Sequence, residues 1–79
     1  MSITVKYFGA LAEATGLTEE TLDLADAGPD LTALRAFCLQ KHGLKEDASI
    51  RLAVNQTLSQ AATLQDGDEV AFLPPFAGG

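Results

Sequence analysis

The C-terminal residues Gly78 and Gly79 carry the group best suited to chemistry in this chain, a free carboxylate on two residues without side chains. Glycine has no Cβ, so its backbone enters narrow spaces and adopts φ values that other residues avoid. A Gly-Gly ending alone also fits an ordinary frayed terminus. Its position after two prolines favours the other interpretation, in which the terminus itself is the reactive group.

Residues 74–79 are predicted to form an extended tail. Pro74 and Pro75 fix their own φ angles and disfavour helical geometry in the residue before each of them. Six extended residues, at about 3.3 Å each, reach roughly 20 Å. The tail is therefore expected to be stiff at its base, slender at Gly78 and Gly79, and long enough to enter a narrow channel in another protein.

Three other groups could do chemistry, and a structural role is favoured for each. Cys38 lies on the apolar stripe of a predicted helix, where a buried and inert thiol is expected. His42 lies near the end of the same helix, where an imidazole favours the helix dipole. Asp66, Asp68 and Glu69 surround a glycine, but a calcium loop needs a longer series of ligands, so we predict a turn. The chain also has no phosphate-binding glycine loop, and we expect a domain that is catalytically inert and binds no cofactor or metal.

The composition indicates one small domain over residues 1–79, in which 47% of the residues are hydrophobic. One cysteine and one histidine supply neither an intramolecular disulfide nor the ligands of a structural zinc site. The net charge of -6 opposes binding to nucleic acid, and both solubility and steering toward a basic protein surface account for it. Without a secretory signal or a membrane-spanning run, a cytoplasmic protein that does not bind membranes is expected.

Hydrophobic periodicity predicts the elements that must hold the tail in place. Alternating apolar residues predict four strands, over residues 2–8, 20–24, 50–54 and 69–73. Apolar residues at helical spacing predict a main helix from about Leu31, with Asp30 as its N-cap and Gly43 as its C-cap. Shorter segments are predicted as one or two helical turns (10–14), a loop (27–30), turns (55–56 and 66–68) and an irregular or short helical connection (57–65).

This order of elements favours an α+β domain, a sheet with one main helix packed on one face. The first two strands are expected to pair as a hairpin around the short helical connection. If the last strand pairs beside the first, the mixed β-sheet has the β-grasp arrangement. The last strand then leads directly into the tail.

Several segments of the chain resemble one known family. They are Ala53-Val54-Asn55-Gln56-Thr57-Leu58, Leu64, Asp66-Gly67-Asp68-Glu69-Val70-Ala71-Phe72, Pro74-Pro75 and Gly78-Gly79. Together they are similar to the small, sulfur-carrier subunits of molybdopterin synthases. The similarity extends over the whole chain, but the final 27 residues, 53–79, carry its specificity.

The resemblance implies a ubiquitin-like β-grasp fold and a covalent role for Gly79. Its carboxylate would be adenylated by an E1-like adenylyltransferase that uses ATP and magnesium, and then converted to a thiocarboxylate with sulfur from a donor protein. The tail, with Gly78 and Gly79 at its tip, would insert into the large catalytic subunit of a heterotetramer. There the sulfur would pass to cyclic pyranopterin monophosphate in molybdenum cofactor biosynthesis, so the chain would be a carrier and not an enzyme.

Three alternatives stay open from the sequence. The sulfur carrier of thiamine biosynthesis also ends in Gly-Gly on a β-grasp domain, although the pattern over residues 66–75 argues against it. A ubiquitin-like modifier would join the Gly79 carboxylate to lysines of target proteins. A plain interaction module would tolerate any change at the tail.

Overall fold

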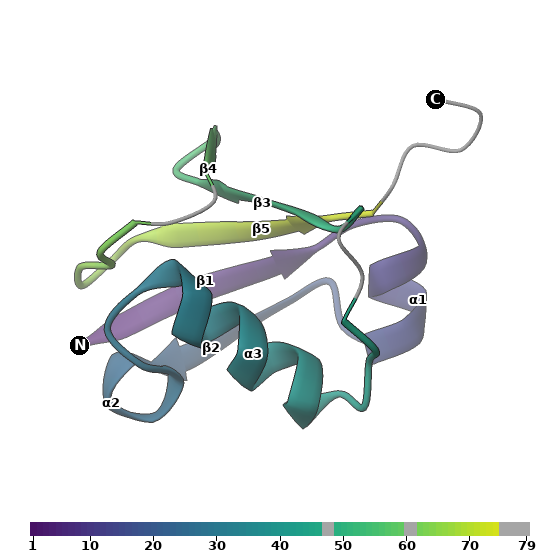
Figure 1. Cartoon of the computed structure of the whole chain (residues 1–79), viewed down its shortest axis with the longest axis horizontal. Helices are drawn as coiled ribbons and strands as arrows, with labels where there is room; N and C mark the ends of the chain where they lie inside the picture. The colour runs from purple at the N-terminus through teal and green to yellow at the C-terminus, as the bar shows by residue number, and fades with distance from the viewer. Residues whose placement is uncertain (47–48, 60–61, 75–79) are drawn as a thin grey trace.

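The computed structural model describes residues 1–46, 49–59 and 62–74. The elements are β1 (Ser2–Tyr7), α1 (Ala10–Thr15), β2 (Glu19–Asp23), α2 (Leu24–Ala27), α3 (Leu31–Lys41), β3 (Arg51–Val54), β4 (Thr57–Ser59) and β5 (Glu69–Leu73). The strands form a sheet in the order β2-β1-β5-β3-β4, in which β1 and β5 are parallel and the other neighbours antiparallel. The helix α3 crosses one face of this sheet (Figure 1). The predicted α+β class, the first hairpin and the β1–β5 pairing of a β-grasp fold are confirmed.

The core lies between α3 and the sheet. Along β1, Ile3, Val5 and Tyr7 point into it, as the alternation of apolar residues predicts. On the adjacent strand β5, Val70 and Phe72 are completely buried. Because β1 and β5 are parallel neighbours, these side chains form one layer under α3.

The N-cap of α3 is Asp30, as predicted, whereas the C-cap residue is His42 and the predicted Gly43 follows it. The Asp30 carboxylate accepts a hydrogen bond of 2.9 Å from the backbone N of Ala33. At the other end, Gly43 has a φ of 66°, and the backbone N of Leu44 donates to the carbonyl O of Leu39 at 2.8 Å. A left-handed glycine with this backbone bond is the usual way to satisfy the last carbonyls of a helix.

The predicted strand over 20–24 is wrong at its end. The strand stops at Asp23, and Leu24 begins the short helix α2, which occupies the start of the predicted loop 27–30. The Asp23 carboxylate caps α2 by accepting a hydrogen bond of 2.9 Å from the backbone N of Ala25. Leu24 is nevertheless buried in the core.

The segment 57–65 also differs from the prediction, because Thr57–Ser59 forms the strand β4 and not an irregular or helical connection. β4 pairs with β3 across the predicted turn at Asn55 and Gln56, whose φ angles are 50° and 73°. Two positive φ angles are typical of a two-residue hairpin turn. The Asn55 side chain holds this turn against β5 by accepting a hydrogen bond of 3.0 Å from the backbone N of Glu69.

Candidate functional site

The strand β5 is a central strand that leads directly into the predicted tail. Its alternation places Val70 and Phe72 in the core and Ala71 and Leu73 on the opposite face of the sheet. β1 lies on one side of it and β3 on the other. Pro74 therefore starts the tail from the middle of the sheet and not from an edge.

The turn between β1 and α1 packs against this starting point. The backbone N of Phe8 donates to the carbonyl O of Phe72 at 3.3 Å. Gly9 has a φ of 56°, and a Cβ added there would lie 3.0 Å from Cγ of Pro74. A side chain at this position would press on the proline ring, in addition to the strain of a positive φ. Phe8 and Gly9 therefore lie directly beside the end of β5 and Pro74.

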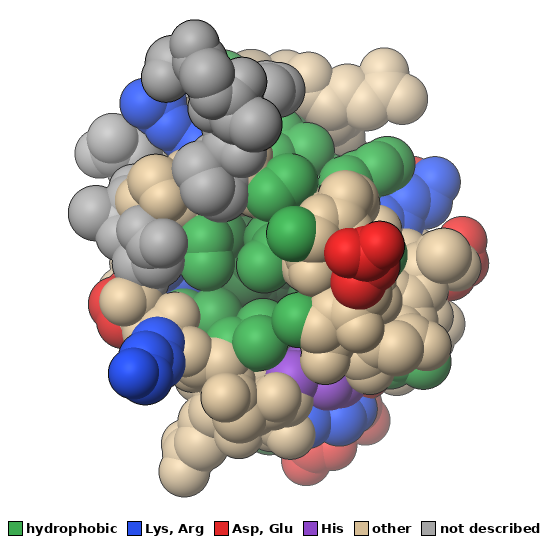
Figure 2. Space-filling model, turned by 90° about the vertical axis from the view of Figure 1, so that its right-hand side faces the viewer, with side chains coloured by type: hydrophobic (Ala, Val, Ile, Leu, Met, Phe, Trp, Pro, Cys, Tyr) green, Lys and Arg blue, Asp and Glu red, His purple; other side chains and the backbone are tan. Residues whose placement is uncertain are grey.

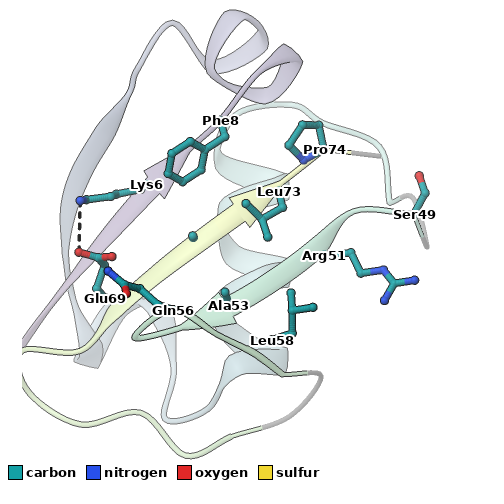
Figure 3. Close-up of a pocket in the computed structure, with 11 residues that line it drawn as sticks. Lys6, Phe8, Ser49, Arg51, Ala53, Gln56, Leu58, Glu69, Leu73 and Pro74 are labelled. Carbon is teal, nitrogen blue, oxygen red and sulfur yellow. Dashed lines mark ion pairs between the residues drawn. The ribbon is translucent and has the colours of Figure 1, made fainter. Parts of the chain in front are cut away.

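The face of the sheet opposite α3 forms a groove of about 810 Å³, here called the sheet groove. Its apolar lining comes from Phe8, Ala53, Leu58, Ala71, Leu73 and Pro74. Figure 3 shows Phe8, Leu73 and Pro74 together at the end of the groove where β5 finishes. The sheet groove is therefore continuous with the base of the tail.

Large apolar side chains in the sheet groove are exposed. The side chain of Phe8 is 46% exposed and that of Leu58 is 61% exposed, whereas the apolar side chains on the other face of the same sheet are buried. Exposed apolar side chains of this kind, gathered on one face, mark sites of interaction with other molecules. Figure 2 views a different side of the molecule, the end that carries α1, where hydrophobic side chains also reach the surface.

The charged residues of the sheet groove differ in their pairing. Lys6 Nζ lies 3.3 Å from Glu69 Oε1, so this pair is largely neutralised. Arg51 is exposed, and within residues 1–46, 49–59 and 62–74 its guanidinium has no hydrogen bond or ion pair. The groove thus carries one uncompensated positive charge.

A second polar cluster lies on the helix side, around the carboxylate of Glu20. Tyr7 Oη donates to Glu20 Oε2 at 2.6 Å, and His42 Nε2 lies 2.7 Å from the same oxygen. Lys41 Nζ donates to Glu20 Oε1 at 2.6 Å. Tyr7 also contacts Phe72, with 5.4 Å between ring centroids. The cluster therefore joins the end of α3 to the strands that support the tail.

The protonation of this cluster follows from its geometry. Burial alone would raise the pKa of Glu20, but the hydrogen bonds from Lys41, Tyr7 and His42 outweigh it and hold that pKa at about 2. Burial, followed by the hydrogen bond to Glu20, raises the pKa of Tyr7 well above its ordinary value. Glu20 is thus an anion and Tyr7 a neutral donor at neutral pH, which is the arrangement of a structural cluster.

The predicted site residues have different outcomes. Gly78 and Gly79 lie outside the described residues, as does the tail 74–79 beyond Pro74, so these predictions stay predictions. Cys38 is 1% exposed, which confirms its place in the core, and burial raises the pKa of its thiol. His42 has the structural role predicted for it, although its partner is Glu20.

The turn prediction for residues 66–68 is confirmed, with a φ of 87° at Gly67. The Asp66 carboxylate accepts a hydrogen bond of 2.8 Å from the backbone N of Ser2. The Asp68 carboxylate accepts from the backbone N of Gln65, also at 2.8 Å, and that bond lowers the pKa of Asp68. These carboxylates therefore hold the turn together.

The sequence analysis assigned no role to the sheet groove. A usable signal was present. Phe8 directly follows β1, and Ala71 and Leu73 occupy alternate positions of β5, so these residues are apolar where a solvent-facing strand would carry polar side chains. The same positions fit ordinary exposed surface, because much of any protein surface is apolar. The groove is recognised only once the strand order brings these residues together.

The arrangement combines a central strand that ends directly before Pro74 with an apolar groove beside it. Across residues 1–46, 49–59 and 62–74, no three His, Cys, Asp or Glu side chains are grouped to hold a metal ion. No helix in those residues is long and apolar enough to cross a membrane. What the domain offers is a starting point for the tail and, beside it, an apolar surface for a partner.

Comparison with known proteins agrees with this architecture. The molybdopterin synthase sulfur carrier subunit of Mycobacterium tuberculosis is 38% identical over 82 aligned positions, which cover 100% of this chain and 99% of that protein. A chain in the complex of subunits 1 and 2 of the molybdopterin-converting factor of Helicobacter pylori is 32% identical, with a TM-score of 0.71 and complete coverage of both chains. SAMP1 of Haloferax volcanii also covers both chains fully with a TM-score of 0.81, but at 22% identity this likeness shows the fold alone.

The fold is thus the ubiquitin-like β-grasp that the resemblance implied. The family description that matches is "ThiS family", and the match runs from Val5 to Gly79. It includes the whole of the predicted tail as well as the strands that support it. The chain belongs to the ThiS family.

Proposed function

We propose that this chain is the sulfur-carrier subunit of a molybdopterin synthase and acts in the cytoplasm. The observation that carries the proposal is the full-length similarity to curated relatives that bear this name, with 38% identity in Mycobacterium tuberculosis and 42% in Escherichia coli. The catalytic residues belong to a large partner subunit, as the two-subunit complex from Helicobacter pylori suggests. The chain itself carries the sulfur.

The carrier site is the carboxylate of Gly79. In an E1-like adenylyltransferase, one oxygen of this carboxylate attacks the α-phosphate of ATP, which is held with magnesium, and pyrophosphate leaves. Sulfide supplied by a donor protein then attacks the acyl carbon, the bond from that carbon to the phosphate oxygen breaks, and AMP leaves with that oxygen while the sulfide loses its proton. A carboxylate is a poor electrophile, whereas an acyl adenylate has a good leaving group, so activation must precede sulfur transfer. The product is a thiocarboxylate that donates its sulfur to cyclic pyranopterin monophosphate.

The sheet groove supplies the binding surface for this chemistry. Phe8, Leu58 and Leu73 offer apolar area beside the tail, and burying such area against the large subunit provides affinity. Gly9 leaves room for the Pro74 ring at the base of the tail, because a Cβ at this position would lie 3.0 Å from Cγ of Pro74. Docking at the groove therefore brings Gly78 and Gly79 to the partner surface with little further ordering of the domain, which lowers the cost of binding.

Mass spectrometry of the intact chain tests the proposal. After incubation with ATP, magnesium, the adenylyltransferase and a sulfur donor, the mass should rise by the difference between sulfur and oxygen, and fragmentation should locate the change at Gly79. A chain with one alanine appended after Gly79 should fold normally but remain unmodified. An alanine added before Met1, which is 71% exposed, is the matched control and should be modified fully.

The thiamine sulfur carrier remains the second candidate, because the matching family is described as ThiS. Copurification of partner proteins distinguishes these two functions. Capture of a pterin-binding large subunit supports the molybdopterin synthase function, whereas capture of a thiazole synthase would replace it. A ubiquitin-like modifier would instead give broad covalent conjugates that disappear when Gly79 is deleted.

A further inference from the structure

The two arginines of the chain, Arg35 on α3 and Arg51 on β3, have different surroundings. Arg35, on α3, donates to the carbonyl O of Ile50 at 2.9 Å and forms an ion pair with Glu46. Its side chain is only 19% exposed, so it fastens the helix to the loop before β3. Arg51 is exposed, lines the sheet groove, and has no such partner among the described residues. The fold gives a structural reason for Arg35 but none for Arg51.

Arg51 also stands beside the exit of the tail. On the neighbouring strand its Cα partner is Leu73, the residue immediately before Pro74. The paired charges Lys6 and Glu69 belong to the part of the groove where β5 begins, as Figure 3 shows. A partner that receives the tail must therefore pass over the guanidinium, while the far part of the groove is already neutral.

Covering an unpaired guanidinium has an energetic consequence. A charge taken out of water without a counter-charge opposes binding strongly. A carboxylate offsets this cost well, because the planar guanidinium donates two parallel hydrogen bonds to its two oxygens. A partner surface that covers the groove with apolar side chains alone would thus bind weakly, and a partner surface with a correctly placed carboxylate would bind more tightly.

We propose that Arg51 is a specificity-determining residue of the sheet groove, whose guanidinium pairs with an aspartate or glutamate of the large subunit beside the entrance for the tail. The partner surface is then apolar opposite Leu58 and Leu73 and acidic opposite Arg51. This pairing rests on the proposed function, because it takes the large subunit as the protein that covers the groove. It explains why a chain with a net charge of -6 keeps, among its described residues, a cation without a counter-charge beside the apolar part of the groove.

Charge reversal tests the pairing with the full-length chain and the purified large subunit. Arg51→Met should raise the dissociation constant about tenfold and Arg51→Glu about a hundredfold, as for close charge pairs at other interfaces. Lys45→Glu is the matched control, because it changes the net charge equally at an exposed residue outside the groove. It should raise the dissociation constant less than about threefold, the size of a general steering effect. Thermal unfolding should be unchanged in all three variants.

A second measurement identifies the counter-charge. Single carboxylate-to-lysine substitutions across the surface of the large subunit should include one that weakens binding of the unmodified chain and restores binding of Arg51→Glu. Equal effects of Arg51→Glu and Lys45→Glu on the dissociation constant would overturn the pairing, and so would the absence of any restoring substitution. In both cases the proposed function stands as long as the unmodified chain binds the large subunit. If the unmodified chain does not bind the large subunit, the proposed function fails together with the pairing.

Discussion

Ile3, Val5 and Phe72 point toward α3 and are completely buried, whereas Lys6 on β1 and Phe8 just after it belong to the open face. The two faces are made by the same strands, and successive side chains alternate between them. One face is covered by the helix α3 of the same chain (Figure 1). The other carries exposed apolar side chains, so its partner must come from outside.

The difference teaches how a small domain separates stability from binding. Side chains under α3 are buried in the free chain and contribute to the free energy of unfolding. Side chains in the sheet groove gain burial only when a partner docks, so they contribute to the free energy of binding. Because β5 belongs to both faces, it also links the core to Pro74 and the tail. Substitutions on the two faces should therefore be separable in two different measurements.

The largest expected effect comes from the same substitution made on each face. Phe72→Ala removes a ring that is 0% exposed and leaves a cavity, which should lower the free energy of unfolding by about 3–5 kcal/mol. Phe8→Ala removes a ring that is 46% exposed and should cost less than about 1 kcal/mol. Urea denaturation of both variants measures the difference. Equal losses would contradict the separation of the two faces.

The next effect concerns the Glu20 cluster at the border of the covered face. Glu20→Gln leaves Tyr7, Lys41 and His42 without their anion and should lower the free energy of unfolding at pH 7 by about 1–3 kcal/mol. Glu19→Gln makes the same change of charge at the preceding exposed residue of β2. That control should stay within about 0.5 kcal/mol of the unsubstituted chain.

The same cluster predicts a pH dependence. The pKa of Glu20 is lowered from its ordinary 4.5 to about 2, so the folded state holds the carboxylate ionised where the unfolded chain would be protonated. Its contribution is complete above pH 4.5 and is lost as the pH falls from there through about 2. Denaturation curves at several pH values should show the difference between the chain and Glu20→Gln shrinking over that range. A difference that persists unchanged at the acidic end would exclude this origin.

The covered face could be predicted from the sequence to a large extent. Alternating apolar residues located β1 and β5, and Asp30 with Gly43 delimited α3, because these signals act within a few residues of the chain. The strand β4 was missed because its three residues are too short to show an alternation. The helix α2 was missed because its four residues depend on a local cap at Asp23 and not on a periodic pattern.

The open face could be predicted less well, for a physical reason. The sheet groove joins Phe8, which follows β1, with Leu58 on β4 and Leu73 on β5, and only the strand order brings them to one surface. Whether Arg51 is paired depends on every residue that folds near it, which no short pattern contains. The role of Gly79 stays a prediction from the sequence and the resemblance, because Gly79 lies outside the described residues.

The smallest expected effect on stability is also the sharpest test of the open face. Leu58 and Leu17 are both exposed leucines, at 61% and 37%, but only Leu58 lines the sheet groove. Leu58→Ser and Leu17→Ser should each change the free energy of unfolding by about 0.5 kcal/mol or less. Leu58→Ser alone should weaken binding to the large subunit, by about three- to tenfold, because it removes apolar area that the partner would bury. Titration calorimetry with the large subunit measures this, and equal binding by both variants would mean that the groove is ordinary surface and that the tail alone makes the contact.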